Sequence, residues 1–293
     1  MKKQKIIYIK QLQKTNIKKT KYLYLYLRML NGLNREEKLQ YERDGYVILK
    51  NVIPKSECKS LMKRSIKPIL RKNNLYYKNK RTRINKTGGF FLGKSGQPIR
   101  GKNRKWPALF QNPRLLLSIC DMHPHYSWKW VDGAATGLGW IHMRFPYSRS
   151  KTWKPPKTGW HLDGLKNNMI DYKKSVTVLP LITSITKNGG GTALFKGSHK
   201  LINYWIHNLQ NRISLSDYID KHVNRELDKY SGDESSDKSR DKSRDKSRKP
   251  TLVEAQGEEG DILIMHPHLI HATSNCGKNN KLRITFNLST NYC

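Results

Sequence analysis

Two short stretches of this chain hold residues that could bind a metal ion. His161-Leu162-Asp163 places an imidazole and a carboxylate two residues apart, and in a strand residues i and i+2 point to the same face. One further histidine would complete a set of two histidines and one carboxylate. That set leaves three positions of an octahedral ion open and is typical of non-haem Fe(II) oxygenases. By itself, His-x-Asp is weak evidence, because it arises often by chance.

The second stretch, residues 260–271, contains three histidines that could supply the missing ligand. His266 and His268 would share one face of a strand, whereas His271 has the opposite parity. Pro267 interrupts regular pairing, so parity does not choose among them. From the residues alone all three stay candidates, and a histidine of this group that is not a ligand would be a hydrogen-bonded or core imidazole.

The elements that must position these residues begin with local signals in the first 122 residues. Asn34 precedes a run rich in acids, as an N-cap does, and residues 76–105 are basic and Gly-rich with no clear period, which predicts a long loop. In chain order we expect a helix from Asn34 to about Arg43, a turn at Asp44-Gly45, a strand over 46–49, a helix from Pro54, the loop over 76–105 and a short helix over 113–122.

The rest of the chain is rich in short β-forming segments. They cover residues 140–145, 176–185, 192–195, 252–255, 262–265 and 282–288, and one helical stretch over 201–230 interrupts them. Short strands separated by turns favour an antiparallel sandwich or barrel over parallel βαβ units. We therefore predict a mainly β fold with flanking helices, a cupin-like jelly roll.

Charge and low complexity divide the chain into three parts. The first 30 residues contain nine basic and no acidic side chains, so residues 1–33 are expected to form a flexible basic arm. Residues 34–293 form the predicted domain. Inside it, Asp-Lys-Ser-Arg occurs three times over residues 237–248, and this insertion at about 231–249 cannot bury apolar surface. We interpret it as a disordered surface insertion.

The composition narrows the classes of partner and compartment. Lys and Arg number 57 against 22 Asp and Glu, a net charge of +35 that attracts polyanions such as nucleic acid. A lysine-favouring genome would produce the same excess.

The four cysteines form no C-x-x-C pair, which argues against a zinc ribbon and favours a reducing compartment. No apolar run reaches the roughly 18 to 20 residues of a membrane span, so we expect an intracellular protein, cytoplasmic with the nucleus as alternative.

The order of several motifs resembles the phytanoyl-CoA dioxygenase family of Fe(II)- and 2-oxoglutarate-dependent oxygenases. The resemblance covers about residues 38–290. It is carried by Asp44-Gly45-Tyr46-Val47-Ile48, Gly159 to Gly164, Gly189-Gly190-Gly191 before Lys196-Gly197-Ser198-His199, and Gly260-Asp261 through His271 to Arg283. It implies a double-stranded β-helix, which agrees with the strand pattern, and Fe(II), 2-oxoglutarate and O2 as cofactors.

The resemblance also implies roles for individual residues. His161 and Asp163 match the first two metal ligands and His271 matches the third. Arg283 matches the arginine that grips the distal carboxylate of 2-oxoglutarate, a task for which a guanidinium fork is suited. Thr285 would add a hydroxyl donor to that carboxylate.

Met143 either matches a methionine that lines the cosubstrate site in the family or packs in the hydrophobic core. The chain departs from the family at Leu162, where a polar residue is common, so a fatty acyl-CoA substrate does not follow.

These observations lead to one main hypothesis and two alternatives. The main one is a dioxygenase that hydroxylates a small organic molecule, phosphate-bearing or acyl, and releases succinate and CO2. In the first alternative the oxygenase acts on nucleic acid or protein. In the second the jelly roll is a catalytically silent polyanion-binding protein. The oligomeric state stays open.

Overall fold

The computed structural model describes most of the expected domain. The described residues are 32–72, 74–76, 79, 89–91, 107–131, 140–148, 150, 152–166, 169–231, 251–277 and 281–293. The predicted basic arm, apart from residues 32 and 33, and the repeats of the predicted insertion lie outside them. Leu33 is buried in the core, and its N–H donates to Asp121 Oδ2 (3.0 Å), so the folded domain already includes this residue.

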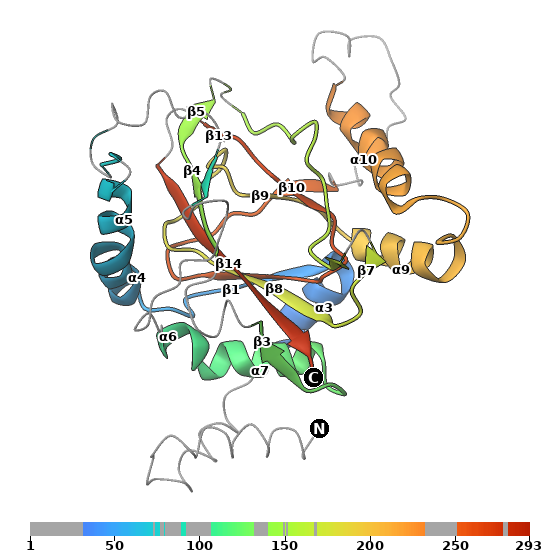
Figure 1. Cartoon of the computed structure of the whole chain (residues 1–293), viewed down its shortest axis with the longest axis horizontal. Coiled ribbons are helices and arrows are strands. Elements are labelled where there is room, and N and C mark those ends of the chain that lie inside the picture. Colours follow the sequence, from blue (N-terminus) through green and yellow to red (C-terminus); the bar gives the residue numbers. More distant parts are fainter. Residues whose placement is uncertain are drawn as a thin grey trace, which may run out of the picture.

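The main layer is an antiparallel sheet of seven described strands (Figure 1). Its order is β1-β11-β8-β14-β4-β2, and β3 also pairs with β14. The strands are β1 (Tyr46–Leu49), β2 (Gly89–Phe91), β3 (Trp128–Trp130), β4 (Trp140–Arg144), β8 (Lys174–Pro180), β11 (Ile262–Met265) and β14 (Arg283–Tyr292).

A second, smaller sheet carries one of the candidate ligands. Its order is β10 (Leu252–Glu254), β9 (Thr192–Phe195) and β12 (His271–Thr273). Two short pairs complete the described strands, β13 (Cys276–Gly277) with β5 (Pro146–Ser148) and β6 (Leu165–Lys166) with β7 (Met169–Ile170). The two packed antiparallel sheets confirm the predicted jelly roll.

Helices lie around the sheets (Figure 1). At the left of Figure 1 lie α4 (Lys55–Leu61) and α5 (Lys67–Lys72), which the π-helix η1 (Met62–Ile66) joins. Along the bottom lie α6 (Pro107–Phe110) and α7 (Pro113–Met122), and at the right lie α9 (Ser198–Asn208) and α10 (Leu215–Ser231). The helix α3 (Arg35–Asp44) precedes β1. The largest hydrophobic cluster joins α4, η1, α5 and α7 to alternate residues of β8, β11 and β14. The main sheet therefore buries one face under helices and turns the other toward the smaller sheet.

Most predicted elements are confirmed, and the differences have local causes. Asn34 caps α3 with a full capping box. The strand predicted over 176–185 ends at Pro180, and residues 181 and 185 continue only as isolated bridges. The helix predicted over 201–230 is two helices, because the chain turns between Leu209 and Ser214. The loop predicted over 76–105 contains the strand β2, and most of its other residues lie outside the described ones. Strands such as β2, β12 and β13 were not predicted, because a segment of two or three residues is too short to show a period.

The motif at Asp44-Gly45 contacts the motif at residues 196–199, and the second of these holds the backbone next to His271. Gly45 ends α3 with φ +79°, and a Cβ there would lie 2.5 Å from His199 Nδ1, so this position requires glycine. Lys196 forms an ion pair with Asp44, with Nζ 3.7 Å from Oδ2. Ser198 Oγ then accepts the N–H of Ile270 at 2.8 Å, directly beside His271.

None of the described helices is long and apolar enough to cross a membrane. All four cysteines are free.

Candidate metal centre

His161 and His271 lie opposite each other in an isolated antiparallel bridge. Each backbone N–H donates to the carbonyl of the other residue, at 2.9 and 3.0 Å. Leu162 and Ile270, their chain neighbours, are buried in one hydrophobic cluster with side chains of α9 and α10. Because successive side chains of an extended chain point to opposite sides, burial of Leu162 turns His161 and Asp163 together toward the other side.

Backbone carbonyls orient both imidazole rings. His161 Nδ1 lies 2.9 Å from the carbonyl of Gly159, and His271 Nδ1 lies 3.0 Å from the carbonyl of Leu269. A carbonyl only accepts, so in each ring Nδ1–H donates and Nε2 keeps its lone pair. This is the arrangement in which histidines usually bind metals.

Asp163 faces the two rings and is held as a carboxylate. Its Oδ2 accepts a hydrogen bond from Thr177 Oγ1 at 2.8 Å and lies 3.7 Å from His271 Nε2. Burial by itself raises the pKa of Asp163, but His271, Lys174 and the Thr177 hydrogen bond outweigh burial and keep the pKa below its ordinary value. The group is therefore ionised at neutral pH, as a metal ligand must be.

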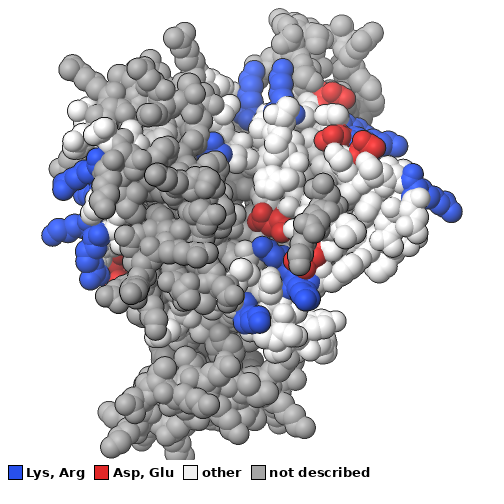
Figure 2. Space-filling view, viewed as in Figure 1, with Lys and Arg blue, Asp and Glu red and all other residues white. Residues whose placement is uncertain are grey.

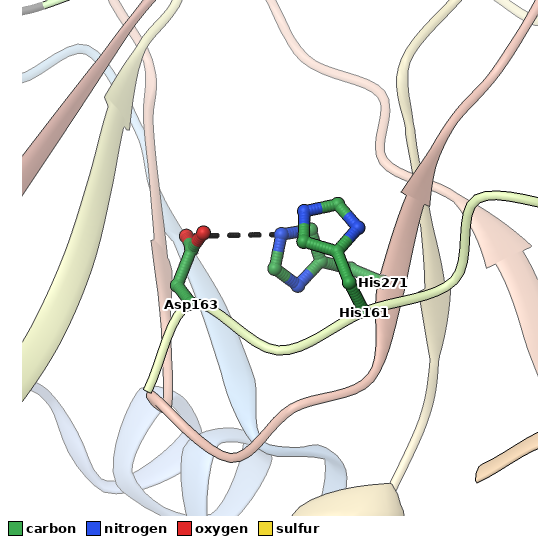
Figure 3. A group of neighbouring side chains, drawn as sticks. All are labelled: His161, Asp163 and His271. Carbon is green, nitrogen blue, oxygen red and sulfur yellow. Dashed lines mark ion pairs between the residues drawn. The ribbon is translucent and has the colours of Figure 1, made fainter. Parts of the chain in front are cut away.

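The three side chains converge (Figure 3), with the two rings side by side and Asp163 opposite them. One ligand atom from each lies within 4.8 Å of the others. Among the described residues this is the one group of three histidine, cysteine or acidic side chains with such geometry. Two imidazole nitrogens and one carboxylate oxygen suit an octahedral iron ion and leave positions open for other ligands.

Arg283 and Thr285 are buried on β14 with unsatisfied polar atoms. Arg283 is 3% exposed; its Nη2 donates to Thr192 Oγ1 at 3.2 Å, whereas its Nε has no hydrogen-bond partner. Burial, and then Arg144, lower the pKa of Arg283 to about 9. Thr285 Oγ1 is also buried without a partner. A buried donor without a partner costs roughly 1 to 3 kcal/mol, so these two groups fit an anionic ligand such as the carboxylate of 2-oxoglutarate.

Met143 does not share a face with these two residues. It pairs with Ile284 across β4 and β14 and is buried in the largest hydrophobic cluster. Residues paired across antiparallel strands point to the same side, and Thr285 is paired with His142. The structure therefore brings His142, and not Met143, to the face of Arg283 and Thr285.

His142 is the main residue that the sequence reasoning missed. Burial, followed by the positive charges of Arg283 and Arg144, lowers its pKa to about 3, so it is neutral at physiological pH. Asp163 and His271 also act on it electrostatically, which places it near both the triad and Arg283. The sequence could have identified His142 as a neighbour of Thr285 only if the register between β4 and β14 had been known, because the register decides which face of the sheet each side chain occupies.

The rival histidines form a separate cluster with His199. The ring centroid of His266 lies 5.1 Å from those of His199 and His268. His266 Nδ1 accepts the N–H of His268 at 3.0 Å, and His268 Nδ1 contacts Asn203 Oδ1 at 2.8 Å. Burial lowers the pKa of His268 to about 4, and burial also lowers the pKa of His266 well below its ordinary value. These residues are neutral, hydrogen-bonded imidazoles packed together.

Glu254 is a second missed residue, and it holds the glycine-rich turn. Its carboxylate accepts the backbone N–H groups of Asn188 (2.6 Å), Gly190 and Gly191 (both 2.9 Å). A Cβ on Gly191 would lie 2.0 Å from a backbone oxygen, so the close approach requires glycine. The turn leads into β9, which carries Thr192, the hydrogen-bond partner of Arg283.

Comparison with family models gives one match. The model described as phytanoyl-CoA dioxygenase (PhyH) matches residues 41–278 of this chain. That range includes both stretches that carry the candidate metal ligands and ends before Arg283. Among curated proteins, no sequence match was found.

Solved structures similar to this chain include three enzymes of low sequence identity. SnoK, a non-heme alpha ketoglutarate dependent carbocyclase from nogalamycin biosynthesis, has 13% identity over 88% of this chain and 84% of its own, with TM-score 0.46. HygX from Streptomyces hygroscopicus, with nickel and 2-oxoglutarate bound, has 14% identity over 89% and 87%, with TM-score 0.48. EctD from S. alaskensis, with bound Fe, has 14% identity over 90% and 78%, with TM-score 0.48.

Proposed function

This chain belongs to the phytanoyl-CoA dioxygenase family of non-haem Fe(II)- and 2-oxoglutarate-dependent dioxygenases, and from that premise we propose that it hydroxylates a small organic molecule and releases succinate and CO2. The observation that carries the proposal is the convergence of His161, Asp163 and His271 in a structure that also buries a guanidinium without a carboxylate partner among the described residues.

His161, Asp163 and His271 would hold the iron. The carbonyls of Gly159 and Leu269 fix the two rings with Nε2 facing Asp163, and Thr177 fixes one oxygen of the carboxylate. These contacts organise the ligands before metal binding, so little ordering of side chains accompanies it.

Arg283 and Thr285 would hold the distal carboxylate of 2-oxoglutarate. The guanidinium can donate two parallel hydrogen bonds, which a lysine ammonium cannot do, and the Thr285 hydroxyl supplies a further donor. His142 is paired with Thr285 and so lies on the same face of the sheet, and its neutral ring would contact the cosubstrate without adding charge.

When bound, iron, 2-oxoglutarate and O2 supply the oxidation, in which the cosubstrate is decarboxylated and one oxygen atom enters a C–H bond of the substrate. The protein's own groups orient the ligands and exclude water around them. No side chain needs to act as a general base. The two histidine ligands need only stay neutral, and burial favours this state for His271 by lowering its pKa.

The substrate class rests on the surroundings of the triad. His161 is exposed, so the site opens on its side of the triad. The segment before it carries the exposed cations Lys154 and Lys157, together with Trp153, whose indole donates to Ser274 Oγ at 3.0 Å. Cations next to an aromatic ring suit a substrate with a phosphate or acyl group.

Turnover without substrate tests the proposal. Anaerobically purified protein supplied with Fe(II), 2-oxoglutarate and then O2 should form succinate. Asp163→Ala should abolish this turnover, and Arg283→Lys should raise the KM for 2-oxoglutarate by about 100-fold, in line with about 3 kcal/mol for a lost bidentate charged contact. Lys129→Gln, at an exposed position on β3, is the control. A wild-type protein that binds no Fe(II) would overturn the proposal in favour of a silent binding module.

A further inference from the structure

The positive charge of the described helices is concentrated in one place. The continuous helical run of α4, η1 and α5, residues 55–72, contains seven basic residues and one acidic residue. In contrast, α3 contains three basic and four acidic residues, and α10 has the same balance. Residues 55–72 therefore carry a net charge of 7 − 1 = +6, whereas α3 and α10 each carry 3 − 4 = −1, so basic residues of this run have few acidic neighbours to balance them.

Five basic side chains of this run are exposed, because its apolar residues point inward: Lys55, Lys59, Lys63, Arg64 and Arg71. Cys58, Ile66 and Leu70 are at most 1% exposed and belong to the largest hydrophobic cluster. Lys59 and Lys63 are exposed and take part in none of the ion pairs between described residues. Basic side chains line the left edge of the molecule in Figure 2, where Figure 1 shows α4 and α5, whereas acidic and basic side chains alternate around α10.

The shape of this surface favours an extended polyanion. At 1.5 Å per residue, the 16 steps from Lys55 to Arg71 span about 24 Å along the helix. Double-stranded DNA carries one phosphate charge per about 1.7 Å of its axis, so such a length of helix can face several phosphates at once. A small phosphorylated metabolite would instead need a concave site.

We propose that the outer face of α4, η1 and α5 is a docking surface for the phosphodiester backbone of a nucleic acid. A membrane surface fits less well, because an interfacial helix inserts its apolar face into lipid, and here that face is buried in the core. The hydrophobic cluster packs on the face of the main sheet opposite that of Arg283 and Thr285. The surface would therefore localise the enzyme on a polyanion and is separate from the metal centre.

Salt-dependent binding of the full chain tests this surface. The variant Lys59→Gln/Lys63→Gln/Arg64→Gln and the wild type are titrated against a labelled 20-base-pair DNA and a labelled 20-nucleotide RNA by fluorescence anisotropy, from 50 to 300 mM salt. Each lost phosphate contact lowers the slope of log K against log salt by about 0.9 for duplex and about 0.7 for single strands. We expect the duplex slope to fall by about 2 to 3, with at least a tenfold loss of affinity at 100 mM salt. Comparison of the two probes shows which form of nucleic acid is preferred.

A matched control removes the same charge elsewhere. Lys129→Gln/Lys200→Gln/Lys221→Gln replaces three exposed lysines on β3, α9 and α10, and it should leave the slope unchanged. Succinate formation should be unaffected in both variants, which reports that they fold. The single variant Arg64→Gln should lower the duplex slope by about 0.9. Equal losses in the two triple variants, an unchanged slope in the first, or binding to phosphatidylserine vesicles with none to either nucleic acid would each overturn the proposal.

Discussion

Two groups of histidines lie within one stretch of the fold but have different environments. In the triad, backbone carbonyls occupy Nδ1 of His161 and His271, so that both Nε2 atoms face Asp163. In the cluster of His199, His266 and His268, the rings contact one another, the backbone and an amide. The residue type is the same in both groups, and the direction of the free lone pairs differs.

The electrostatic balance of the two groups differs as well. Burial lowers the pKa of His271, but Asp163 opposes this effect. For His266 burial is reinforced by the neighbouring histidines, and its pKa falls well below the ordinary value. A carboxylate that faces the rings therefore distinguishes a centre that can attract a cation from a packed cluster that excludes one.

The largest expected effect comes from removing one histidine from each group. His271→Ala should lower 2-oxoglutarate turnover at least 1,000-fold, because two ligands hold iron far less well than three. His266→Gln should keep its iron and most of its turnover. The iron content and the rate of succinate formation are measured for each variant. Comparable iron loss in the two variants would show that the second cluster also belongs to the metal site.

The next effect tests the hydrogen bond that orients Asp163. Thr177→Val removes the donor to Oδ2, so the carboxylate is less well oriented and its pKa rises. We expect Fe(II) affinity to fall by about 10- to 100-fold, the usual cost of losing such a contact. Thr290→Val is the control, since its hydroxyl is buried against Val176 on the same sheet and does not contact the triad. Unchanged iron affinity for Thr177→Val would refute the role.

Acidification should destabilise the packed cluster. Because the folded-state pKa of His268 is about 4 and its ordinary value is 6.5, the unfolded chain binds the proton first as pH falls. The free energy of unfolding should therefore be fully retained above about pH 6.5 and decrease toward pH 4, by about 1 kcal/mol per pH unit for this residue.

Urea unfolding of iron-free protein at pH 7.5 and 5.5 measures this decrease. His268→Gln should show a smaller loss between the two pH values than the wild type. The same pH dependence in both proteins would mean that other groups, such as His123, whose pKa burial also lowers to about 4, account for it.

The smallest effect comes from giving the packed cluster a carboxylate. Asn203→Asp places a negative charge at the amide that contacts His268 Nδ1, and it should raise the pKa of His268 by about one unit. Asn208→Asp, on the same helix and exposed, is the control. The pKa of His268 in each variant is measured by following the histidine signals in NMR as a function of pH. If Asn203→Asp also bound a second equivalent of Fe(II), ring orientation would not be what separates the two groups.

Much of the fold could be predicted because its signals are local. Asn34 and Asn112 cap their helices with side-chain hydrogen bonds to residues three positions on, and β9 and β11 begin and end where the apolar runs do. Where the prediction differed, the residue pattern did not reveal a local turn. The single helix expected over 201–230 is two helices, and Trp205 Nε1 donates to the carbonyl of Ile213 across the turn between them.

The sequence by itself indicated the chemistry, because a His-x-Asp pair and three later histidines are residue types that can bind iron. The order of the motifs, through the resemblance to the family, led to our proposal of His161, Asp163 and His271 as ligands and of Arg283 with Thr285 for a carboxylate. Only the tertiary structure decided which other side chains lie next to these candidate site residues. The register of β4 against β14 brings His142 rather than Met143 to the face of Thr285, and distant residues supply Thr177 to Asp163 and Thr192 to Arg283. These contacts depend on strand pairings between residues far apart in the chain, and a one-residue shift of register would reverse every face.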